Sequence, residues 1–585
     1  MAVENLITEH IDIWTSAVTT KSTSGRGSSK KLELYGIKKL RELILELAVR
    51  GKLVPQHPGE PPVTTLLDKM EQERIRLIEL GKLKKQKMQP PLKQDTHPYN
   101  LPVTWSWMRL SDVAFFQEGP GILAKDFRSS GVPLIRIAGM HEKEVSLKGC
   151  NFLDEKMVQD KWDHFRLDIG DTLLSSSASL GKVSRVTEDS AGAIAYTGLI
   201  RFKTYCALSE DYMSLFFLSG EFIRQINNNK TGAAIKHFGP THLKKMLVPM
   251  PPVKEQHRIV AKVDELMALC DQLEQQTEAS IEAHQVLVTT LLDTLTNSAD
   301  ADELMQNWAR ISEHFDTLFT TEESIDQLKQ TILQLAVMGK LVPQDPSDEP
   351  AAELLKRIAE EKAQLVKEKK IKKQKALPPI SEDEKPFELP SGWEWERIGT
   401  FGIVGTGATP SRSNPKYWDD PKYNWVSSGE TSELFVNTTK EKVSELAIQE
   451  TNVSIYPSGT LIVAMYGQGK TRGQITELTE PAGTNQACAA IQLIEKNESH
   501  KDFVKLYFRK SYEELRSNAA GGAQPNLNIG KVQSTVIAVP PLNEQRRINT
   551  KVNELLTVCD HLKAHFEAVQ STQLHLTDAI VEQAV

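Results

Sequence analysis

The chain has few cysteines, and they stand far apart. No two of the five have the CxxC spacing of a zinc site or a redox pair: Cys150, Cys206, Cys270, Cys488 and Cys559. The 14 histidines include no HExxH pair, the spacing that places two imidazoles on one helix face around zinc. We therefore expect no disulfide framework and no metal site, and a reduced, cytoplasmic setting fits.

Long apolar runs are missing too. No stretch approaches the ~20 apolar residues that cross a bilayer, and the start, MAVENLITEH, has no basic segment followed by an apolar one. We expect neither a membrane span nor a signal peptide. Hydrophobic residues are 39% and charged residues 25% of the 585, which is ordinary for a globular protein. A chain of this length needs several cores.

A basic excess is also absent. The chain has 70 lysines and arginines against 77 aspartates and glutamates, a formal net charge of −7. Proteins that bind nucleic acid tightly on their own usually carry a positive excess, because phosphate contacts drive their affinity. If this chain reads nucleic acid, partners must supply much of the positive surface.

Two segments resemble catalytic motifs but are incomplete. YGQGKT at 466–471 looks like the end of a phosphate loop, yet Ala464 stands where the first glycine of GxxxxGK[ST] belongs, and the following RGQIT favours a strand. NPKY at 414–417 is similar to the Asn-Pro-Pro-Tyr tetrad of adenine methyltransferases but lacks its second proline. With no triad or carboxylate pair either, we expect no active site in this chain.

The chain does carry one long motif twice. LRELILELAVRGKLVPQ at 40–56 returns 288 positions later as LKQTILQLAVMGKLVPQ at 328–344. The same offset maps two further segments: KLKKQKMQPP (82–91) onto KIKKQKALPP (370–379), and LPVTWSW (101–107) onto LPSGWEW (389–395). We call this set element B. A repeat of this length indicates two copies of one structural unit.

A second element, A, follows each copy of B. PPVKEQHRIVAKVDEL at 251–266 returns 289 positions later as PPLNEQRRINTKVNEL at 540–555. Between B and A lie two segments with little shared sequence, T1 (108–248) and T2 (396–537). The order B, T, A, B, T, A indicates a constant scaffold that presents two different readers. If the terminal B and A meet in space, they complete a pseudo-twofold arrangement.

The scaffold elements are predicted to be helices. In LRELILELAVRG, four apolar residues fall on one helical face and Gly51 ends the helix: Leu40, Leu43, Ile44 and Leu47. Its copy ends likewise at Gly339. A second helix is expected at 63–87 and at 351–376, each with lysine-rich last turns that suit the negative end of the helix dipole.

Element A is predicted to begin a helix of about 43 residues, ~65 Å long, over 253–297 and in its copy. The expected buried stripe is Ile259, Val263, Leu266, Leu269 and Leu273, with copies Ile548, Val552, Leu555, Val558 and Leu562. Two such helices bury their stripes most simply as an antiparallel pair. The alternative is that each packs only on its neighbouring domain.

The T segments are predicted to be mixed α/β. Four short β-rich runs alternate with glycine-containing turns: VPLIRIAG (132–139), DTLLSSS (171–177), GTLIVAM (459–465) and ACAAIQL (487–493). Basic and amide side chains in the loops can contact guanine or adenine edges, although such residues populate most solvated loops. The candidates for duplex contact are Lys182, Arg185, Lys230, Lys236, His237, Arg412, Asn414, Lys416, Tyr417, Gln468, Lys470, Arg472, Gln524, Asn526 and Asn528.

These motifs together resemble the specificity subunit of type I restriction–modification enzymes. The likeness lies in LAVRGKLVPQ, LPxxWxW, PPLxEQ and GTGATPSRSNPKYW at 405–418. It implies an α+β fold with two mixed α/β target recognition domains, separated by two long antiparallel helices in a pseudo-twofold repeat. The PSRSNPKYW loop has no twin in T1, so residues do not map one to one between the halves. The expected segments are a helical region (1–100), recognition domain 1 (101–250), a central helical region (251–388), recognition domain 2 (389–539) and a long helix (540–585).

The family implies a division of labour. Each T would read one half of a bipartite, asymmetric double-stranded DNA site, and the long helices would set the gap. Two modification subunits would bind S-adenosylmethionine and methylate adenine N6, and two restriction subunits would use ATP and Mg, so this non-catalytic chain would bind no cofactor. The candidate docking residues for partner subunits are Arg41, Leu45, Arg50, Glu255, Gln256, Arg258, Gln330, Gln334, Glu544, Gln545 and Arg547.

Two other functions remain alternatives. One is a non-catalytic scaffold with two protein-binding domains and no nucleic acid. The other is an enzyme that acts alone. Binding of random duplexes with and without a modification subunit separates the first alternative from a DNA reader, and methylation by the isolated chain would support the second.

Overall fold

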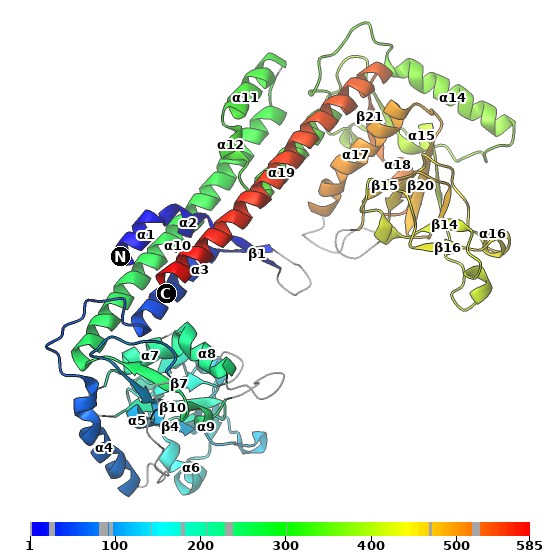
Figure 1. The fold of residues 1–585 in the computed structure, drawn as a ribbon. Coiled ribbons are helices and arrows are strands. Elements are labelled where there is room, and N and C mark those ends of the chain that lie inside the picture. Colours follow the sequence, from blue (N-terminus) through cyan, green and yellow to red (C-terminus); the bar gives the residue numbers. More distant parts are fainter. Residues whose placement is uncertain are drawn as a thin grey trace. The chain divides into compact units, whose positions relative to one another are not determined.

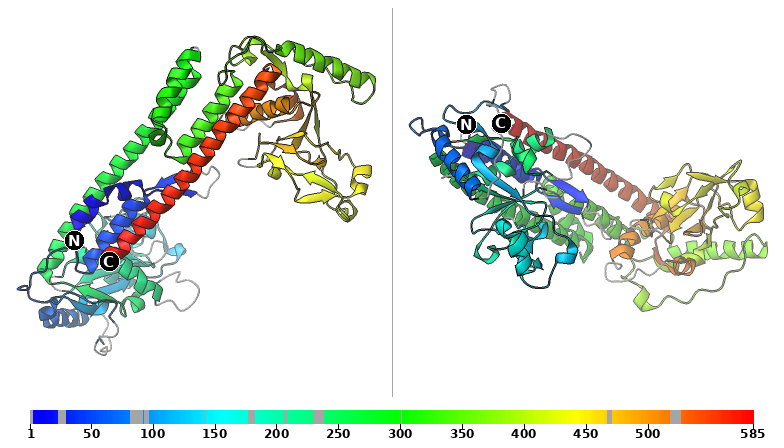
Figure 2. Two further views of the ribbon diagram at one scale, coloured as in Figure 1. Left: turned by 45° about the horizontal axis from the view of Figure 1, so that its top comes forward. Right: turned by 90° about the horizontal axis from the view of Figure 1, so that it is seen from below.

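The computed structural model describes residues 3–22, 30–80, 92, 97–141, 143–176, 182–205, 208–228, 238–299, 301–466, 471–517 and 527–585. The chain divides into two compact units: Met1–Ser280 with Val569–Val585 (unit 1), and Ile281–Ala568 (unit 2). Both chain ends belong to unit 1 (Figure 1, Figure 2). No helix in the described ranges is both long and apolar enough to cross a membrane.

Unit 1 begins with a helical region and continues into T1. The helical region contains α1 (Val3–Glu9), α2 (Ile11–Ser16), β1 (Thr19–Ser22), β2 (Lys30–Glu33), α3 (Tyr35–Val49), the 3-10 turn η1 (Val63–Leu66) and α4 (Leu67–Glu79). The strands of T1 are β3 (Ser106–Arg109), β4 (Ala114–Glu118), β5 (Val132–Ile135), β6 (Asn151–Leu153), β7 (Thr172–Ser175), β8 (Val183–Arg185), β9 (Ile194–Ala195), β10 (Leu199–Thr204) and β11 (Leu247–Met250). Its helices are α5 (Leu110–Val113), α6 (Glu155–Lys161), α7 (Glu210–Leu218), α8 (Gly220–Asn228) and α9 (Pro240–Leu243).

Unit 2 has the same plan. Its helical region contains α11 (Ala301–Glu313), α12 (Phe315–Leu318), α13 (Glu322–Val337) and α14 (Ala351–Lys367). The strands of T2 are β12 (Glu394–Arg397), β13 (Gly402–Thr406), β14 (Tyr423–Val426), β15 (Phe435–Val436), β16 (Glu441–Val443), β17 (Leu461–Ala464), β18 (Ile475–Leu478), β19 (Ala482–Thr484), β20 (Cys488–Leu493) and β21 (Val536–Val539). Its helices are α15 (Ile398–Phe401), α16 (Glu445–Glu450), α17 (Glu498–Ser517) and α18 (Ile529–Ser534).

Two long helices are shared by the units. Helix α10 (Val253–Thr296) begins in unit 1 and ends in unit 2, whereas α19 (Leu542–Ala584) begins in unit 2 and ends in unit 1. Neither contains proline or glycine within these bounds, so nothing in the backbone interrupts the helical hydrogen-bond ladder. The sequence prediction of two helices of about this length is confirmed.

T1 and T2 share the same strand order, except for the additional strand β15 at the edge of the main sheet of T2, although their sequences diverge. T1 has a main sheet in the order β4-β10-β7-β8 and a small sheet β6-β5-β9, and T2 has β13-β20-β17-β18-β15 and β16-β14-β19. In each T, the first and last strands form a two-stranded antiparallel ribbon, β3–β11 or β12–β21. The predicted strands at 132–139, 171–177, 459–465 and 487–493 are confirmed as β5, β7, β17 and β20. The main strands are apolar because both faces of the sheet are covered.

In each unit, a short helix packs between the start of one long helix and the end of the other. Unit 1 shows it through Arg41 to Asp271 (2.7 Å), Gln56 to Glu255 (2.6 Å), Tyr35 to Asp578 (2.8 Å) and Lys52 to the Val585 carbonyl (2.7 Å). Unit 2 shows it through Lys329 to Asp560 (2.7 Å), Gln344 to Glu544 (2.7 Å), Gln285 to Glu323 (2.7 Å) and Lys340 to the Thr296 carbonyl (2.8 Å). These pairs make α3 and α13 antiparallel to the starting helix and parallel to the ending one. Within each unit, the two long helices therefore run in opposite directions.

The buried stripe of the long helices departs most from the prediction at one position. Ile259, Val263 and Leu266 are buried as expected, but Leu269 is 42% exposed and Cys270 takes its place in the core. The copy departs at the same position, since Val558 is 46% exposed and Cys559 is buried. Three further residues of the predicted stripe are only half-buried: Leu273, Leu555 and Leu562. A step of four residues turns an α-helix by about 400° and a step of three by about 300°. Cys270, four residues after Leu266, therefore comes closer to the core-facing direction than Leu269, three residues after it.

Helix α14 ends nine residues before the predicted end at 376. Lys369 adopts the left-handed conformation with φ 58°, and the amide of Lys370 donates to the Leu365 carbonyl at 3.0 Å. That is the closing bond of a helix C-terminus, normally made around glycine. The first copy carries Gly81 at the equivalent position. The lysines that follow therefore lie beyond the helix and do not cap its dipole. In the first copy α4 ends at Glu79, so the prediction of a helix as far as 87 is wrong there too; residues 81–91 lie outside the described residues.

Replacing Lys369 by glycine is expected to raise the free energy of unfolding of unit 2 by about 0.5–1 kcal/mol. A side chain in the left-handed region costs ~1 kcal/mol or more, and this relief exceeds the extra unfolded-state entropy of glycine. Urea unfolding followed by tryptophan fluorescence would measure it. Lys367→Gly, within the helix, is the matched control and is expected to destabilise.

Candidate nucleic-acid interface and the nodes that hold it

Two of the T1 candidates for duplex contact lie in described residues. Arg185 ends β8, the edge strand of the main sheet, and pairs with Asp211 at 2.7 Å while its side chain stays 43% exposed. Lys182 is half-buried before β8, and its carbonyl accepts the Ser175 amide at 2.8 Å. The remaining T1 candidates lie outside the described residues: Lys230, Lys236 and His237.

In T2, Arg412 is held from three sides. Its two Nη atoms donate to both oxygens of Glu441 at 2.6 and 2.7 Å. The guanidinium carbon lies 3.8 Å from the ring centre of Trp418 and 5.6 Å from that of Trp425. The hydrogen bond from Arg412 lowers the pKa of the Glu441 carboxyl, so the pair stays charged at neutral pH. A cation so fixed, with its side chain 55% exposed, is a preorganised donor for a base edge or a phosphate.

The neighbouring candidates shape the same loop. The Asn414 side chain accepts the Lys416 amide at 3.3 Å and so begins the 3-10 turn η8 (Pro415–Tyr417). Tyr417 donates its hydroxyl to Glu450 at 3.1 Å. Asn414 and Tyr417 are half-buried and Lys416 is exposed, so Arg412 and Lys416 are the exposed cations of this loop.

The other T2 candidates fall into two groups: residues that are part of the fold and residues that the structure does not describe. Asn528 begins α18 by accepting the Lys531 amide at 2.9 Å, and Arg472 is half-buried beside the strand β18. Four candidates lie outside the described residues: Gln468, Lys470, Gln524 and Asn526. Within the described ranges, no three His, Cys, Asp or Glu side chains are grouped to hold a metal ion.

The three repeated motifs meet at one buried node in unit 2. Glu544 of PPLNEQ accepts from Gln344 of LVPQ at 2.7 Å and from the indole of Trp393 of LPSGWEW at 3.0 Å. Glu544 is 1% exposed and Trp393 4%. Burial raises the pKa of the Glu544 carboxyl, and the two hydrogen bonds oppose that rise. One carboxylate therefore joins the long helix, the helical region and the entry of T2.

Unit 1 contains the equivalent node. Glu255 is fully buried and accepts from Gln56 at 2.6 Å, and the buried Trp105 stands at the position of Trp393. Burial likewise raises the pKa of the Glu255 carboxyl. A flanking ion pair is repeated too: Arg258 binds Glu60 at 2.5 Å and, in unit 2, Arg547 binds Asp348 at 2.7 Å. The motifs are shared because they build the same joint twice.

The glutamine after each of these glutamates fastens the long helix to its T. Gln256 accepts the Ser209 amide at 2.9 Å and donates to the Pro251 carbonyl at 2.9 Å. Gln545 donates to the Pro540 carbonyl at 2.7 Å, and its side-chain oxygen lies 3.1 Å from Nδ1 of His500. Both glutamines are fully buried. The nodes thus orient each T on its scaffold through buried side chains that hydrogen-bond across distant parts of the chain.

This internal use bears on the docking candidates. The buried Glu255, Gln256, Glu544 and Gln545 are enclosed by their own unit, so they hold the joint and present no surface to a partner. Arg41, Arg50, Arg258 and Arg547 are each paired with a carboxylate of the same unit, and Leu45, Gln330 and Gln334 are half-buried. The family resemblance implied docking by these residues of the repeated elements, but the nodes show that a repeated residue can also mark an internal joint. Docking by the partly exposed residues stays a prediction.

Sequence reasoning missed the groups that position the interface. Glu441 and Trp425 of the Arg412 cluster stand outside any motif, and only Trp418 belongs to GTGATPSRSNPKYW. Gln344 and Trp393 were visible as repeated letters, yet no role was assigned to them. Their pairing with Glu544 spans 200 and 151 residues, which no local pattern reveals.

Comparisons with known proteins agree with this architecture. A sequence model of the type I restriction modification DNA specificity domain matches twice, over residues 102–283 and 390–568. Each match begins in an LPxxWxW motif, covers one T and ends within a long helix.

Two curated relatives are similar over their full length. The type I restriction enzyme EcoEI specificity subunit of Escherichia coli is 41% identical over 616 residues, and the EcoAI specificity subunit of the same species is 40% identical over 618, each with 100% of both chains covered. Among solved structures, a chain from a study of complex assembly and conformational transition of the type I R-M system covers 83% of this chain and 99% of its own, at 17% identity and a TM-score of 0.48.

Proposed function

Because this chain belongs to the family of type I restriction–modification specificity subunits and serves DNA recognition in such a system, we propose that T1 and T2 each read one half of a bipartite, asymmetric DNA site. The observation that carries the proposal is a common core of strands built twice from divergent sequences on equivalent nodes. A half-site discriminates weakly, since each mismatch costs ~1–3 kcal/mol. Joining two half-sites in one chain makes the second contact intramolecular and raises selectivity.

The test is a band-shift assay on duplexes, with and without the cognate modification subunit. Sequence-selective binding is expected mainly in the assembled complex, because the chain is acidic overall. Methylome sequencing of cells that carry the chain with its partners would give the target. Absence of duplex binding under both conditions would favour the protein-scaffold alternative.

We further propose that α10 and α19 set the gap between the half-sites. Each helix passes from one unit to the other without a break, and a helix keeps a fixed rise of ~1.5 Å per residue. Their length is comparable with the ~35–70 Å of one to two turns of DNA. The alternative is that each helix packs only on its neighbouring domain. Each helix is divided between the two units, and this division does not support that alternative.

Deleting one heptad from each long helix is expected to change the gap and leave both half-sites unaltered. Residues 275–281 and the equivalent 564–570 avoid the flanking contacts of Glu274, His284 and Lys563. Seven residues are ~10 Å of helix, or about three base pairs at 3.4 Å each. Methylome sequencing measures the gap, and an unchanged gap with normal methylation would contradict the spacing role. The same deletion in only one helix is expected to abolish methylation by the assembly, because the two long helices would no longer be in register.

The partner proposal follows the same family. Two modification subunits would supply S-adenosylmethionine and adenine-N6 methylation, and two restriction subunits would supply ATP- and Mg-dependent steps, while this cytoplasmic chain would contribute no catalytic group. Equivalent exposed apolar residues support two equal docking faces. Unit 1 exposes Leu269 (42%) and Leu576 (45%), and unit 2 exposes their repeat equivalents Val558 (46%) and Leu287 (49%). Apolar side chains kept exposed in both copies are typical of interaction surfaces.

A further inference from the structure

A lysine-rich segment between α14 and T2 has no role in the fold described so far. Residues 368–380 follow α14, and we call them the lysine strap. With Lys367, the segment holds six lysines up to Lys375, and KIKKQK (370–375) returns in the first copy as KLKKQK at 82–87, outside the described residues. Because α14 stops at Lys367, the dipole of a helix does not account for these charges.

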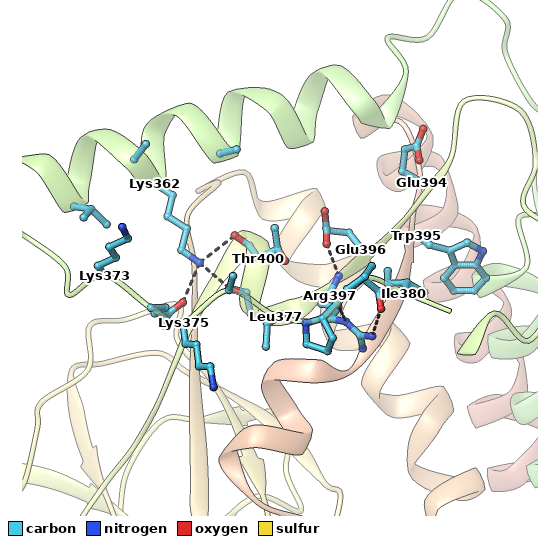
Figure 3. A pocket seen from close by; sticks show the side chains of 18 of the residues that line it. Lys362, Lys373, Lys375, Leu377, Ile380, Glu394, Trp395, Glu396, Arg397 and Thr400 are labelled. Carbon is cyan, nitrogen blue, oxygen red and sulfur yellow. Dashed lines mark hydrogen bonds between the residues drawn. The ribbon is translucent and has the colours of Figure 1, made fainter. Parts of the chain in front are cut away.

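The strap is fastened to T2 at several points (Figure 3). Lys362 of α14 donates to the Gln374 side chain at 3.0 Å and to the Gly399 carbonyl at 2.6 Å. Arg397, 3% exposed, donates to the carbonyls of Pro378 at 2.9 Å and Pro379 at 3.2 Å. Both anchoring cations therefore donate hydrogen bonds to acceptors in the strap or in T2. The strap therefore keeps a fixed position on the second reader.

With the strap anchored in this way, its lysine side chains lie on faces exposed to solvent. Every third strap residue is half-buried, namely Ile371, Gln374, Leu377 and Ile380, and the residues between them are exposed. A period of three is that of a polyproline II strand, and Pro378-Pro379 favours it. Lys372, Lys373 and Lys375 fall on the exposed faces. They form no ion pair within the described part of the chain, whereas Lys370 pairs with Glu368 at 2.9 Å.

The strap also borders a solvent-open pocket of about 750 Å³ between α14, the strap and the start of T2. Lys362, Lys373 and Lys375 line it (Figure 3). Lys385 lines it as well. The acidic residues that face it are Glu394 and Glu396, and the latter accepts the Arg397 amide at 2.8 Å. Even with these carboxylates counted, lysines dominate the rim, so the site favours an anion.

We propose that the lysine strap binds the phosphate backbone of DNA and moves with T2 as a sequence-independent grip. The motif is common to both copies while the readers diverge, so its ligand is a feature that all targets share. The cations are lysines, which act as mobile point charges toward phosphates, rather than arginines that read planar groups. The strap is tied to the reader by Arg397 and Lys362, not to the exposed apolar positions of the long helices. This inference deepens the DNA-recognition role and rests on it.

The test is the salt dependence of duplex binding by the assembly with its modification subunits. The triple substitution of Lys372, Lys373 and Lys375 by alanine is expected to make the slope of log affinity against log salt shallower by about two to three, at ~0.9 per phosphate contact. Specific and random duplexes should lose affinity by the same factor, and the methylated sequence should not change. Hydroxyl-radical footprints should lose protection only on the side of the half-site that T2 reads.

Two matched variants control the result. Replacing the three lysines by arginine is expected to keep the slope. Replacing Lys356, Lys496 and Lys551 by alanine removes the same charge elsewhere in unit 2 and should leave the slope near wild type. An unchanged slope in the strap variant would overturn the proposal. So would weakened subunit assembly with normal binding once assembled, which would assign the strap to an acidic protein surface. Loss of sequence-selective binding even at low salt would instead question the reading of DNA by T2.

Discussion

Exchange of residues 108–248 for the corresponding segment of another specificity subunit is expected to change one half of the methylated target and keep the other half. The cut points lie in the ribbon that closes T1, where Met108 and Val248 face each other in register. The two chain crossings are therefore ~5 Å apart, and any segment with the same ribbon can join there. Scaffold, long helices and T2 remain as they were. Methylome sequencing measures both half-sites in one experiment.

The structure also predicts which exchange is tolerated better. T1 meets the scaffold partly through the backbone amide of Ser209, which any donor segment retains. T2 meets it through the His500 imidazole on Gln545, so exchange of 396–537 should need a donor side chain at that place. The T2 exchange is expected to alter the opposite half-site. A change in both half-sites after a single exchange would contradict one reader per half-site.

Replacing Glu544 by alanine is expected to lower the free energy of unfolding of unit 2 by about 1–3 kcal/mol. The substitution leaves the buried indole N–H of Trp393 without an acceptor, and an unsatisfied buried donor costs ~1–3 kcal/mol. The loss of the bond from Gln344 adds little, because Gln344 is exposed and also donates to the Gly339 carbonyl at 3.0 Å. Relief of the buried carboxylate offsets part of this loss. Hydrogen exchange would locate the effect, because the amides of β12 and β21 should exchange faster while those of β3 and β11 stay protected.

The repeat supplies the matched control. Glu255→Ala should expose the amides of β3 and β11 and spare β12 and β21. Equal loosening of both units by either substitution would show that the nodes are not independent joints. The conservative Glu544→Gln keeps an acceptor for Trp393 but turns an amide group toward Gln344, so a smaller loss, about 1–2 kcal/mol, is expected.

Replacement of the same two glutamates is also expected to change how the free energy of unfolding depends on pH. Burial raises the pKa of the Glu255 and Glu544 carboxyls in the folded chain. Such groups contribute stability that is fully present below the unfolded pKa of about 4.3 and is lost as pH rises through the folded pKa. The double variant Glu255→Gln, Glu544→Gln should therefore lose less free energy of unfolding than wild type as the pH rises from the unfolded pKa to the folded pKa. Parallel pH profiles for both proteins would contradict the raised values.

Local patterns in the sequence predicted the elements well. Leu40, Leu43 and Ile44 are buried as their spacing indicated, and the helix ends at Val49, just before Gly51 with its φ of 70°. The stop of α14 was also visible, because Gly81 in the first copy aligns with Lys369, but the lysine run was taken as part of the helix. The error of one residue at Leu269 arose because apolar character alone does not distinguish Leu269 from Cys270.

The candidate site was predicted less well than the fold. Arg412 was selected by residue type, yet its fixed orientation depends on Glu441 and Trp425, which come from other strands of T2. Repeated letters marked Glu255 and Glu544 as shared, but sharing does not distinguish an exposed docking residue from a buried joint. Burial is a property of the packed chain, so the sequence left that choice open.

The amino-acid order alone determined the duplication, the family, the long uninterrupted helices and the mixed α/β readers, because periodicity and motif repetition are written in near neighbours. The tertiary structure decided which repeated polar groups are enclosed, how one carboxylate joins three distant motifs, and where the lysines of the strap are held. Those outcomes depend on contacts across 150 to 200 residues, whose partners are brought together only when hydrophobic burial closes each unit.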